Sequence, residues 1–417
     1  MLQRRFVHAV VVLATLTLCC FPLTAQKKRP QPAGGGRRIT EFPVPDAAPV
    51  DVATATKLAM QGLIGLEEEG GQWPYEGVYR EDRGQLPQGY RVGGTSIAIL
   101  GMVCAPGYRD DEARVAAVDR ALRFVLKTLE VDRMQKGFQG GYDVRGWGHI
   151  YALTCLLHLQ DAKMVPKELA EQVDKKVPWL VETLVESAIP KNGGWNYSRR
   201  AGYMSPRNRA STFMTAPALQ ALFHAKKRGH AVPDDVVEQA LDALDRSRSV
   251  GGGYAYGSSS QNRNDIEEED IRSIMDKTPS AAARAAVCET TLMLAGRGNA
   301  ERHAAAIDLF FEHWDDLAVR KSQLNTHIPP YGIAPYYFMF GHMYTAQAIE
   351  QLADADRRAH YRTRMREYLA RSIEQNGTWN DRQFGRSASY GTAMALLAMH
   401  MPHLPKPFAW RAASAKK

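Results

Sequence analysis

The sequence predicts an all-α protein in which six outer and six inner helices form two concentric rings. A turn of Gly, any residue, and then Trp or Tyr recurs five times, at Gly71-Gln72-Trp73, Gly140-Gly141-Tyr142, Gly193-Gly194-Trp195, Gly252-Gly253-Tyr254 and Gly377-Thr378-Trp379. A helical pattern with one apolar stripe precedes each turn, and a helical pattern that is apolar nearly all round follows it. No segment shows the alternation of apolar and polar residues that is typical of a strand.

The outer helices are the amphipathic ones. In residues 115–129, for example, apolar residues recur at steps of three and four with Arg and Asp between them, which gives one apolar face. Pro166 and Pro233 stand where two more outer helices begin, because the first turn of a helix does not need the N–H that proline lacks. The expected outer helices cover residues 53–66, 113–130, 167–186, 234–247, 302–317 and 357–375.

The inner helices are poor in charge and rich in Ala and Gly, as expected of helices buried on every side. Their expected ranges are residues 95–103, 148–159, 211–225, 281–295, 337–349 and 388–399. Successive turn aromatics are 69, 53, 59 and 125 residues apart, and the last interval spans about two units. We therefore expect a sixth, degenerate turn near residues 329–332, and six outer and inner pairs that close into a ring.

The amino-terminal residues 1–25 are typical of a secretory signal peptide. Arg4 and Arg5 precede the apolar run 9–18, and Ala25 ends the segment. The run can be extended to a length that spans a membrane, so an uncleaved anchor is the alternative. Residues 26–50 are basic and rich in Pro and Gly, which predicts a flexible linker. A helical domain over 51–405 and a basic tail over 406–417 follow, and the expected location is secreted or periplasmic.

The formal net charge of +8 belongs to the two ends of the chain. Residues 1–50 carry a net charge of +5 and residues 401–417 a net charge of +4, which leaves −1 for the rest. A nearly neutral helical domain argues against a nucleic-acid partner. Outside the signal, Cys104, Cys155 and Cys288 lie in separate apolar segments and are expected to be buried thiols rather than a disulfide framework.

With these residues in place, the chain resembles the terpenoid cyclase and protein prenyltransferase group, whose (α/α)6 toroid carries Gly-x-Trp turns between outer and inner helices. Within that group it is most similar to the secreted prenyltransferase/squalene-oxidase-repeat proteins of planctomycete type, in stretches such as residues 285–289, 330–337 and 389–394. The resemblance covers roughly residues 53–400. It implies the α/α toroid and no particular reaction.

The motifs that carry chemistry in that group are missing from this sequence. The Asp-x-Asp-Asp cluster of the cyclases has no match, since the earlier Asp is absent before each paired acid, at Asp110-Asp111, Asp234-Asp235 and Asp315-Asp316. Cys288 has Ala286 where the zinc-binding Asp of the prenyltransferases stands. We expect no metal site, and the sequence defines no cofactor.

The densest polar and aromatic stretch contains His327, Tyr331, Tyr337, His342 and Tyr344. A tyrosine-rich packed helix with a satisfied histidine is one interpretation. In the other, His327 or His342 acts with Tyr337 as an acid and base pair in an aromatic cavity.

Glu289 lies inside an otherwise apolar helix, five residues after Arg284. A buried carboxylate needs a partner, so Glu289 is either one half of a structural ion pair across the ring or a catalytic group. Arg207 and Arg209 follow the third turn and are either a solvated loop or a clamp for carboxylates. Further candidate ligand contacts are Tyr197, Tyr256, Arg284, Tyr331, Tyr344, Arg382 and Tyr390.

We expect a secreted toroid that binds a ligand or an extracytoplasmic protein partner in its central cavity, the ligand being a small molecule, a lipid or a saccharide. The alternative is an extracytoplasmic enzyme, either a uronate polysaccharide lyase or hydrolase or a divergent terpenoid-type cyclase. An enzyme predicts that His327, His342, Glu289, Arg207 and Arg382 share one open cavity. A binding module predicts that these groups are individually paired. A membrane contact is expected only through an uncleaved signal.

Overall fold

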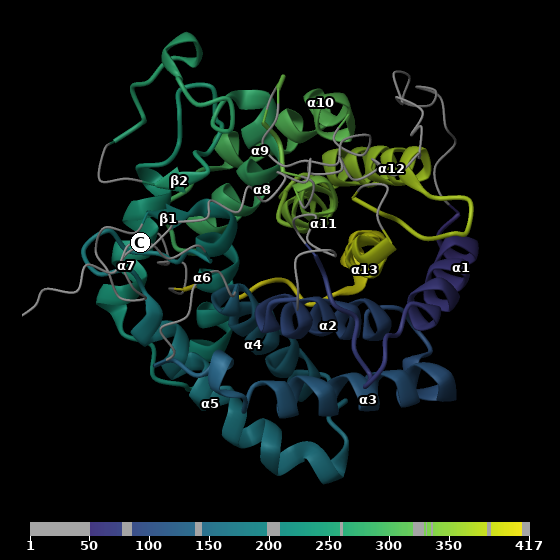
Figure 1. Ribbon diagram of the computed structural model, residues 1–417. Helices are drawn as coiled ribbons and strands as arrows, with labels where there is room; N and C mark the ends of the chain where they lie inside the picture. The colour runs from purple at the N-terminus through teal and green to yellow at the C-terminus, as the bar shows by residue number, and fades with distance from the viewer. Residues whose placement is uncertain are drawn as a thin grey trace, which may run out of the picture. The chain divides into compact units, whose positions relative to one another are not determined.

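The computed structural model describes residues 51–76, 86–137, 144–197, 209–258, 262–319, 329–330, 332–334, 337–381 and 385–410. These residues form an α/α toroid of six inner and six outer helices, which confirms the predicted fold (Figure 1). The described strands are β1 (Ala210–Ser211) and β2 (Gly257–Ser258), which pair antiparallel. Within these ranges, no helix has the length and hydropathy needed to span a bilayer.

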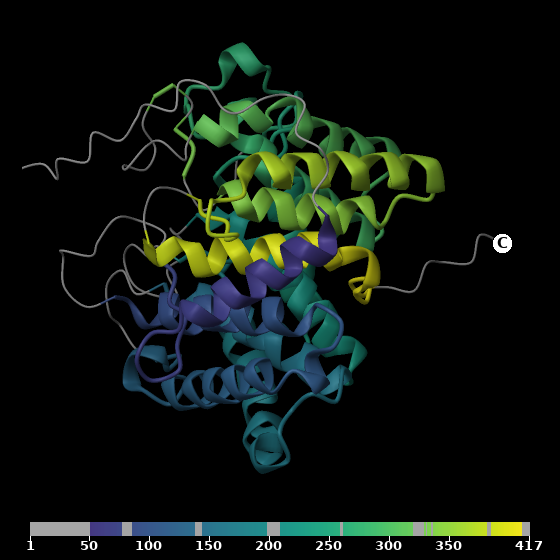
Figure 2. The same ribbon diagram turned by 90° about the vertical axis from the view of Figure 1, so that its right-hand side faces the viewer.

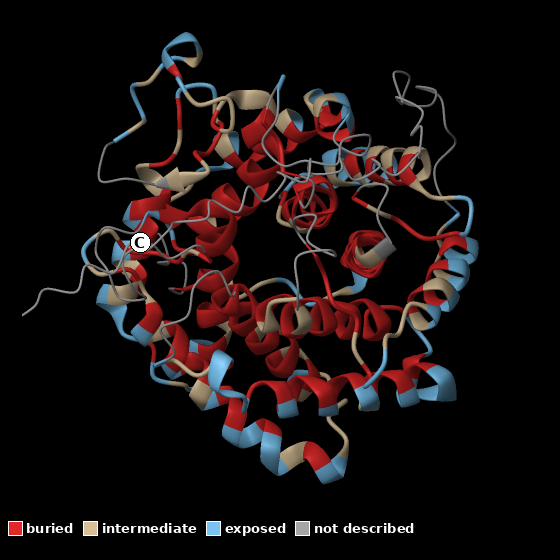
Figure 3. Cartoon of the chain, viewed as in Figure 1, coloured by how far each residue is buried: buried red, intermediate tan, exposed pale blue. Residues whose placement is uncertain are grey.

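The inner ring consists of helices that are buried along almost their whole length (Figure 3). They are α2 (Gln88–Val103), α4 (Arg145–Asp161), α6 (Thr212–Lys227), α8 (Thr278–Leu294), α11 (Tyr337–Ile349) and α13 (Ala388–His400). Each inner helix packs on the next, and α13 packs on α2, so the ring closes. The inner helices run in the same direction, so their amino ends lie at one face of the ring, here called the turn face, and their carboxyl ends at the opposite face, here called the carboxyl face (Figure 2).

The outer ring consists of amphipathic helices whose apolar stripes face the inner ring. They are α1 (Val52–Gly65), α3 (Glu112–Thr128), α5 (Ala170–Ser187), α7 (Asp234–Asp245), α9 (Ala300–Glu312) and α12 (Ala355–Ser372). The predicted fifth outer helix is split at His313, after which the short α10 (Trp314–Ala318) begins. Helix α1 packs on both α13 and α2, so the first helix of the domain covers the seam between the last and the first inner helix.

Short 3-10 helices join these elements, at η1 (Tyr108–Asp110), η2 (Asp132–Met134), η3 (Lys167–Leu169), η4 (Glu268–Asp270), η6 (Gly385–Ser387) and η7 (Met401–His403). Several outer helices begin at an acidic or amide side chain that accepts a hydrogen bond from the first turn. Asp51 caps α1, Asp111 caps α3, Asn299 caps α9 and Asp354 caps α12. Such caps satisfy N–H groups that have no partner within the helix.

The Gly-x-Trp turns tie an outer helix to the inner helix that follows it. In the first unit, the Trp73 indole N–H donates to the carbonyl oxygen of Leu63 at 2.7 Å, and the Trp73 backbone N–H donates to Thr95 Oγ1 at 2.9 Å. The glycine is required because the next outer helix approaches closely. A Cβ on Gly193, which has a φ of 73°, would lie 2.1 Å from the carbonyl oxygen of Gln239 on α7.

The interior of the domain is continuous and mostly apolar, and it contains the three cysteines. Cys104, Cys155 and Cys288 are buried and free, as the sequence predicts. Burial raises the pKa of the Cys104 thiol to about 12. A thiol that stays protonated is a weak nucleophile and a poor metal ligand, so these residues serve packing.

Candidate functional site

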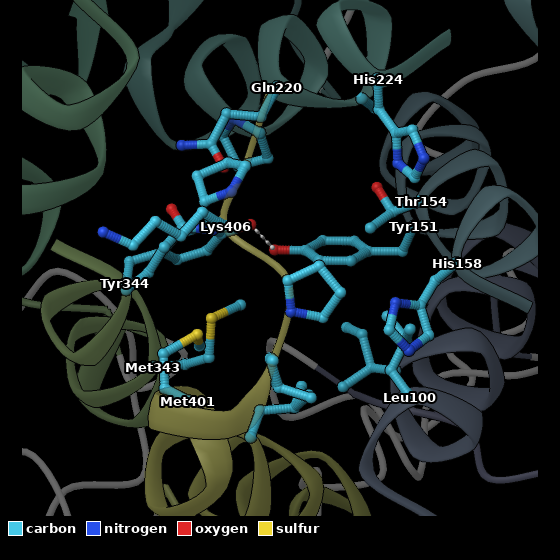
Figure 4. A pocket seen from close by; sticks show the side chains of 18 of the residues that line it. Leu100, Tyr151, Thr154, His158, Gln220, His224, Met343, Tyr344, Met401 and Lys406 are labelled. Atoms are coloured by element: carbon cyan, nitrogen blue, oxygen red, sulfur yellow. Dashed lines mark hydrogen bonds between the residues drawn. The ribbon is translucent and has the colours of Figure 1, made fainter. Parts of the chain in front are cut away.

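A cavity of about 150 Å³ lies inside the inner ring, toward the carboxyl ends of its helices (Figure 4). Helices α2, α4, α6, α11 and α13 supply its walls, and the chain after α13 supplies the remaining side. The wall is mainly apolar, with contributions from Ile97, Leu100, Met343, Met394, Leu397, Met401, Leu404 and Phe408. A concave, largely apolar site with a few converging polar groups is the usual form of a small-molecule site.

Two tyrosines meet across this cavity. Tyr151 comes from α4 and Tyr344 from α11, and their hydroxyl oxygens are 3.3 Å apart (Figure 4). Burial raises the pKa of both phenols far above the ordinary value. Both side chains are therefore neutral near pH 7 and able to donate and accept hydrogen bonds. Tyr344 is a ligand contact that the sequence predicts, and the structure places it in the cavity wall.

A His–Asp pair lies at the edge of the cavity, where α4 ends beside α6. The Nε2 of His224 is 2.7 Å from Oδ2 of Asp161, and Arg228 contacts the other carboxylate oxygen. Burial would raise the pKa of Asp161, but the hydrogen bonds from His224 and Arg228 outweigh it and the pKa is lowered. Burial lowers the pKa of His224, against the opposing effect of Asp161. Asp161 is thus ionised and His224 neutral near pH 7, with its Nε2–H donated to the carboxylate.

His158 lies one turn before Asp161 on α4 and also lines the cavity. Burial lowers its pKa, and the neighbouring His224 lowers it further. Among the described residues none forms a hydrogen bond with the His158 ring. The cavity therefore contains one neutral imidazole with two open nitrogens.

Two glutamines complete the polar part of the wall. Gln220 on α6 uses its amide nitrogen to donate to Thr291 Oγ1 at 3.0 Å. Gln347 on α11 has a buried Oε1 atom that accepts no hydrogen bond from any described residue. A buried acceptor without a donor is costly, so this oxygen is a point at which a ligand donor gains free energy.

The carboxyl-terminal residues 404–410, here called the strap, cross the carboxyl face beside the cavity (Figure 4). Phe408 packs on the His224 ring with centroids 4.6 Å apart, and Trp410 packs on Phe223 at 5.4 Å. The Lys226 ammonium lies 3.8 Å from the centre of the Trp410 ring, and the Trp410 backbone N–H donates to Leu294 at 2.9 Å. Residues 408–410 are thus packed against the helical domain.

At the turn face, the described residues include a closely packed group of aromatic side chains. Tyr75 stacks on Tyr390 with centroids 4.2 Å apart, and Trp147 lies 5.8 Å from both Tyr75 and Tyr90. The gap lined by Tyr75, Tyr90, Val144, Trp147, Tyr197 and Phe213 measures only about 10 Å³, the size of one water molecule. In the described part of the chain, the larger cavity lies at the opposite face.

Three other predicted ligand contacts belong to the turn face. Arg284 is fully buried, donates to the carbonyl oxygen of Tyr254 at 2.7 Å and lies 4.7 Å from the centre of the Tyr337 ring. Tyr256 lies 6.4 Å from Tyr337 and 6.5 Å from Tyr197, centroid to centroid. Arg284, Tyr337, Tyr256 and Tyr197 therefore form one cluster, separate from the residues that line the cavity.

His342 and Glu289 face the outer ring. The Trp314 indole N–H donates to His342 Nε2 at 2.8 Å, so the ring proton is on Nδ1, which donates to the carbonyl oxygen of Phe338 at 2.8 Å. Glu289 accepts from Arg248 and Tyr254, both at 2.9 Å, and from Arg302 at 3.0 Å. Both groups are buried with their own partners, so neither is our candidate for catalysis.

Arg209 is not among the residues that line the cavity. Arg209 is exposed, and its backbone carbonyl accepts from Asn196 at 2.6 Å. His327, Arg207, Tyr331 and Arg382 lie outside the described residues.

The sequence reasoning missed His158, Asp161, His224 and Gln347. A signal exists for two of them, because Thr154, His158 and Asp161 follow one another at steps of four and three on a helix that is otherwise mostly apolar. In the described part of the chain, no group of three or more His, Cys, Asp or Glu side chains is placed to hold a metal ion.

Several solved structures share this fold. The α-1,6-mannanase GH76A of Salegentibacter sp. HEL1_6 aligns with a TM-score of 0.54 and 10% identity over 84% of this chain and 99% of that chain. The cellobiose 2-epimerase of Bacillus thermoamylovorans aligns with a TM-score of 0.50 and 10% identity, again over 84% and 99%. A type II terpene cyclase from Scytonema reaches a TM-score of 0.47 at 12% identity, over 85% and 98%.

No family model matches the sequence, and no curated protein is significantly similar to it. The likeness to the mannanase and the epimerase shows the α/α-toroid fold alone.

Proposed function

We propose that this chain is an exported α/α-toroid protein that binds a small ligand in the cavity between Tyr151, His158, Tyr344 and Gln347. The observation that carries the proposal is the cavity itself, of about 150 Å³, which combines an apolar wall with open polar groups from separate helices. The His158 ring on α4 and the Gln347 Oε1 atom on α11 have no hydrogen-bond partner among the described residues, and open polar groups that converge in this way are typical of a ligand site.

The pairing of the other polar residues supports binding over catalysis. His342 and Glu289, two groups that an enzyme would need in an open cavity, are each engaged with neighbours outside it. The three pairs of adjacent aspartates lie on outer elements. Asp110-Asp111 is at the end of η1 and the cap of α3, Asp234-Asp235 is at the start of α7, and Asp315-Asp316 is in α10. By contrast, the mannanase with this fold has an inactive variant in which two adjacent aspartates are replaced.

The test is a panel of anionic, cationic and neutral fragments, with binding measured by ligand-observed NMR. Ala221→Leu adds three carbon atoms to the cavity wall and should abolish the binding of every fragment that occupies the cavity. Ala359→Leu makes the same change on the exposed side of α12 and should leave binding unchanged. If no fragment binds the wild type in a way that Ala221→Leu removes, the proposal is wrong.

Export and family are also part of the proposal. Arg4, Arg5 and the apolar run 9–18 support a secretory signal, and the Gly-x-Trp turns support membership of the secreted prenyltransferase/squalene-oxidase-repeat proteins. Expression of the full chain followed by fractionation and amino-terminal sequencing tests export. Recovery from the periplasm with a new amino terminus near residue 26 is expected, and an uncleaved chain in the cytoplasm would contradict it.

Catalysis is the second candidate, because His224, held by Asp161 at 2.7 Å, lies in the same cavity as His158 and Tyr151. A histidine that a carboxylate orients is a common general base. Incubation with polyuronides tests a lyase through new unsaturated chain ends, and incubation with α-1,6-mannan tests a hydrolase through new reducing ends.

A further inference from the structure

We propose that the cavity selects an uncharged molecule about the size of one six-membered ring that carries a hydroxyl or N–H donor, with phenol as the simplest example. This inference rests on the proposed function and narrows it to a class of ligand. It departs from the carboxylate-bearing ligand that the arginines of the sequence suggested. Size, charge and an open acceptor each support it independently.

The first argument is size. The cavity holds about 150 Å³, and an apolar protein cavity of roughly that volume accommodates a single benzene ring. The walls that would touch such a ring are side chains of Leu100, Met343, Met394 and Leu397. Methionine side chains are flexible and make favourable contacts with aromatic ring edges, so this wall suits a flat ring.

The second argument is charge. The charged residues that line the cavity are Asp161 and Lys406. Both carboxylate oxygens of Asp161 are engaged, one by His224 and the other by Arg228, and Lys406 is exposed to solvent on the strap. The polar groups farther inside, from Tyr151, Tyr344 and Gln347, are uncharged near neutral pH. An ionised ligand would lose its hydration there without gaining a counter-charge.

The third argument is the unpartnered acceptor. The Oε1 atom of Gln347 is buried and accepts no hydrogen bond from any residue that the structure describes. Carbonyl oxygens only accept, so a ligand that supplies a donor gains a hydrogen bond at this atom. The open nitrogens of the neutral His158 can take a second polar group. A benzene-like molecule without a donor would leave Gln347 unsatisfied, and a hydroxyl or N–H group would correct this.

The experiment compares phenol, cyclohexanol, benzene and benzoate on the full chain by ligand-observed NMR with competition. Phenol and cyclohexanol should bind, benzene about tenfold more weakly because one hydrogen bond is missing, and benzoate at least a hundredfold more weakly. Gln347→Met removes the acceptor at nearly constant size and should reduce the affinity for phenol about tenfold while leaving benzene unchanged.

The control is Gln351→Met, the same change one turn later on the chain and outside the cavity wall, which should alter neither affinity. Benzoate binding as tight as phenol, or a Gln347→Met variant that binds phenol normally, would overturn the inference. If other fragments bind and Ala221→Leu removes them while phenol and cyclohexanol fail, the inference falls and the proposed function stands. If Ala221→Leu removes no binding at all, the proposed function falls as well.

Discussion

The indole N–H of Trp195 donates a hydrogen bond of 2.9 Å to the carbonyl oxygen of Leu184, in the last turn of α5. The indole N–H of Trp73 makes the same bond to Leu63 at the end of α1, at 2.7 Å. The indole N–H of Trp379 makes it to Leu369 near the end of α12, at 3.0 Å. The last carbonyls of a helix lack partners within it, so the turn tryptophan both fills the space between the rings and satisfies a helix end. The repeat motif is therefore a structural device for joining two helices.

Trp195→Phe should retain most of the packing but lose this hydrogen bond. The variant leaves the Leu184 carbonyl with only the Ser187 hydroxyl as a donor, at 3.2 Å, and we expect the free energy of unfolding to fall by about 0.5–1.5 kcal/mol. Urea denaturation followed by circular dichroism measures the change. Trp179→Phe, on the half-buried side of α5, is the matched control. Its free energy of unfolding should be lower than that of the wild type by no more than about 0.5 kcal/mol. If the free energy of unfolding falls equally in the two variants, the indole hydrogen bond of Trp195 does not contribute to stability, and only the size of the ring matters at the turn.

Glu289→Ala should be among the most destabilising single substitutions in the domain. The substitution removes the carboxylate that both Arg248 and Arg302 contact. It leaves the two positive charges without this partner next to the buried position of residue 289. A loss of about 3–5 kcal/mol is expected in thermal or urea unfolding. Glu171→Ala removes the exposed partner of Lys175 and should cost less than about 1 kcal/mol. A folded Glu289→Ala protein of wild-type stability would contradict this assignment and reopen a functional role for the carboxylate.

His303 should make the domain less stable in mild acid. Burial lowers its pKa from 6.5 to about 4, so below pH 6.5 the unfolded chain takes up a proton that the folded chain does not. Its contribution to stability is complete above pH 6.5 and is lost as the pH falls toward 4, by about 2 kcal/mol between pH 7 and pH 5. Urea titrations of the wild type and of His303→Gln at both pH values measure the difference.

The glutamine variant retains a polar group for Thr290, which lies 3.1 Å from His303 Nε2, but it cannot titrate. Its stability should therefore fall by about 2 kcal/mol less than that of the wild type over this range. If the free energy of unfolding of the wild type and that of His303→Gln fall by the same amount between pH 7 and pH 5, His303 is not the group responsible for the loss of stability in acid.

Trp410→Ala should detach the strap from the carboxyl face. The variant loses the ring contact with Phe223 and the cation–π contact with Lys226. Amide hydrogen exchange in residues 404–410 should then become at least about tenfold faster, and exchange in the interior of α4 should not change. Lys406→Ala, at an exposed strap position, is the control and should exchange like the wild type. Unchanged strap exchange in Trp410→Ala would show that Trp410 does not anchor it.

The sequence by itself determined the two rings of helices. The patterns that specify them are local: a stripe of apolar residues marks an outer helix, a run without charge marks an inner helix, and Gly-x-Trp marks the turn between them. The predicted range 337–349 coincides with α11, and the other helix boundaries differ by seven residues at most, at the start of α2. The burial of the three cysteines could also be predicted, because each lies in an apolar segment of the sequence.

Only the tertiary structure decided where the cavity lies and which residues line it. A helix that is apolar on all sides shows no preferred face, so its sequence cannot say whether His342 points outward to Trp314 or Tyr344 inward to Tyr151. Residues as distant in the sequence as Tyr151 and Phe408 line the same cavity, and the sequence does not show that the tertiary structure brings them to one place. Local pattern fixes each helix, but the rotation of each helix within the ring depends on packing against all its neighbours.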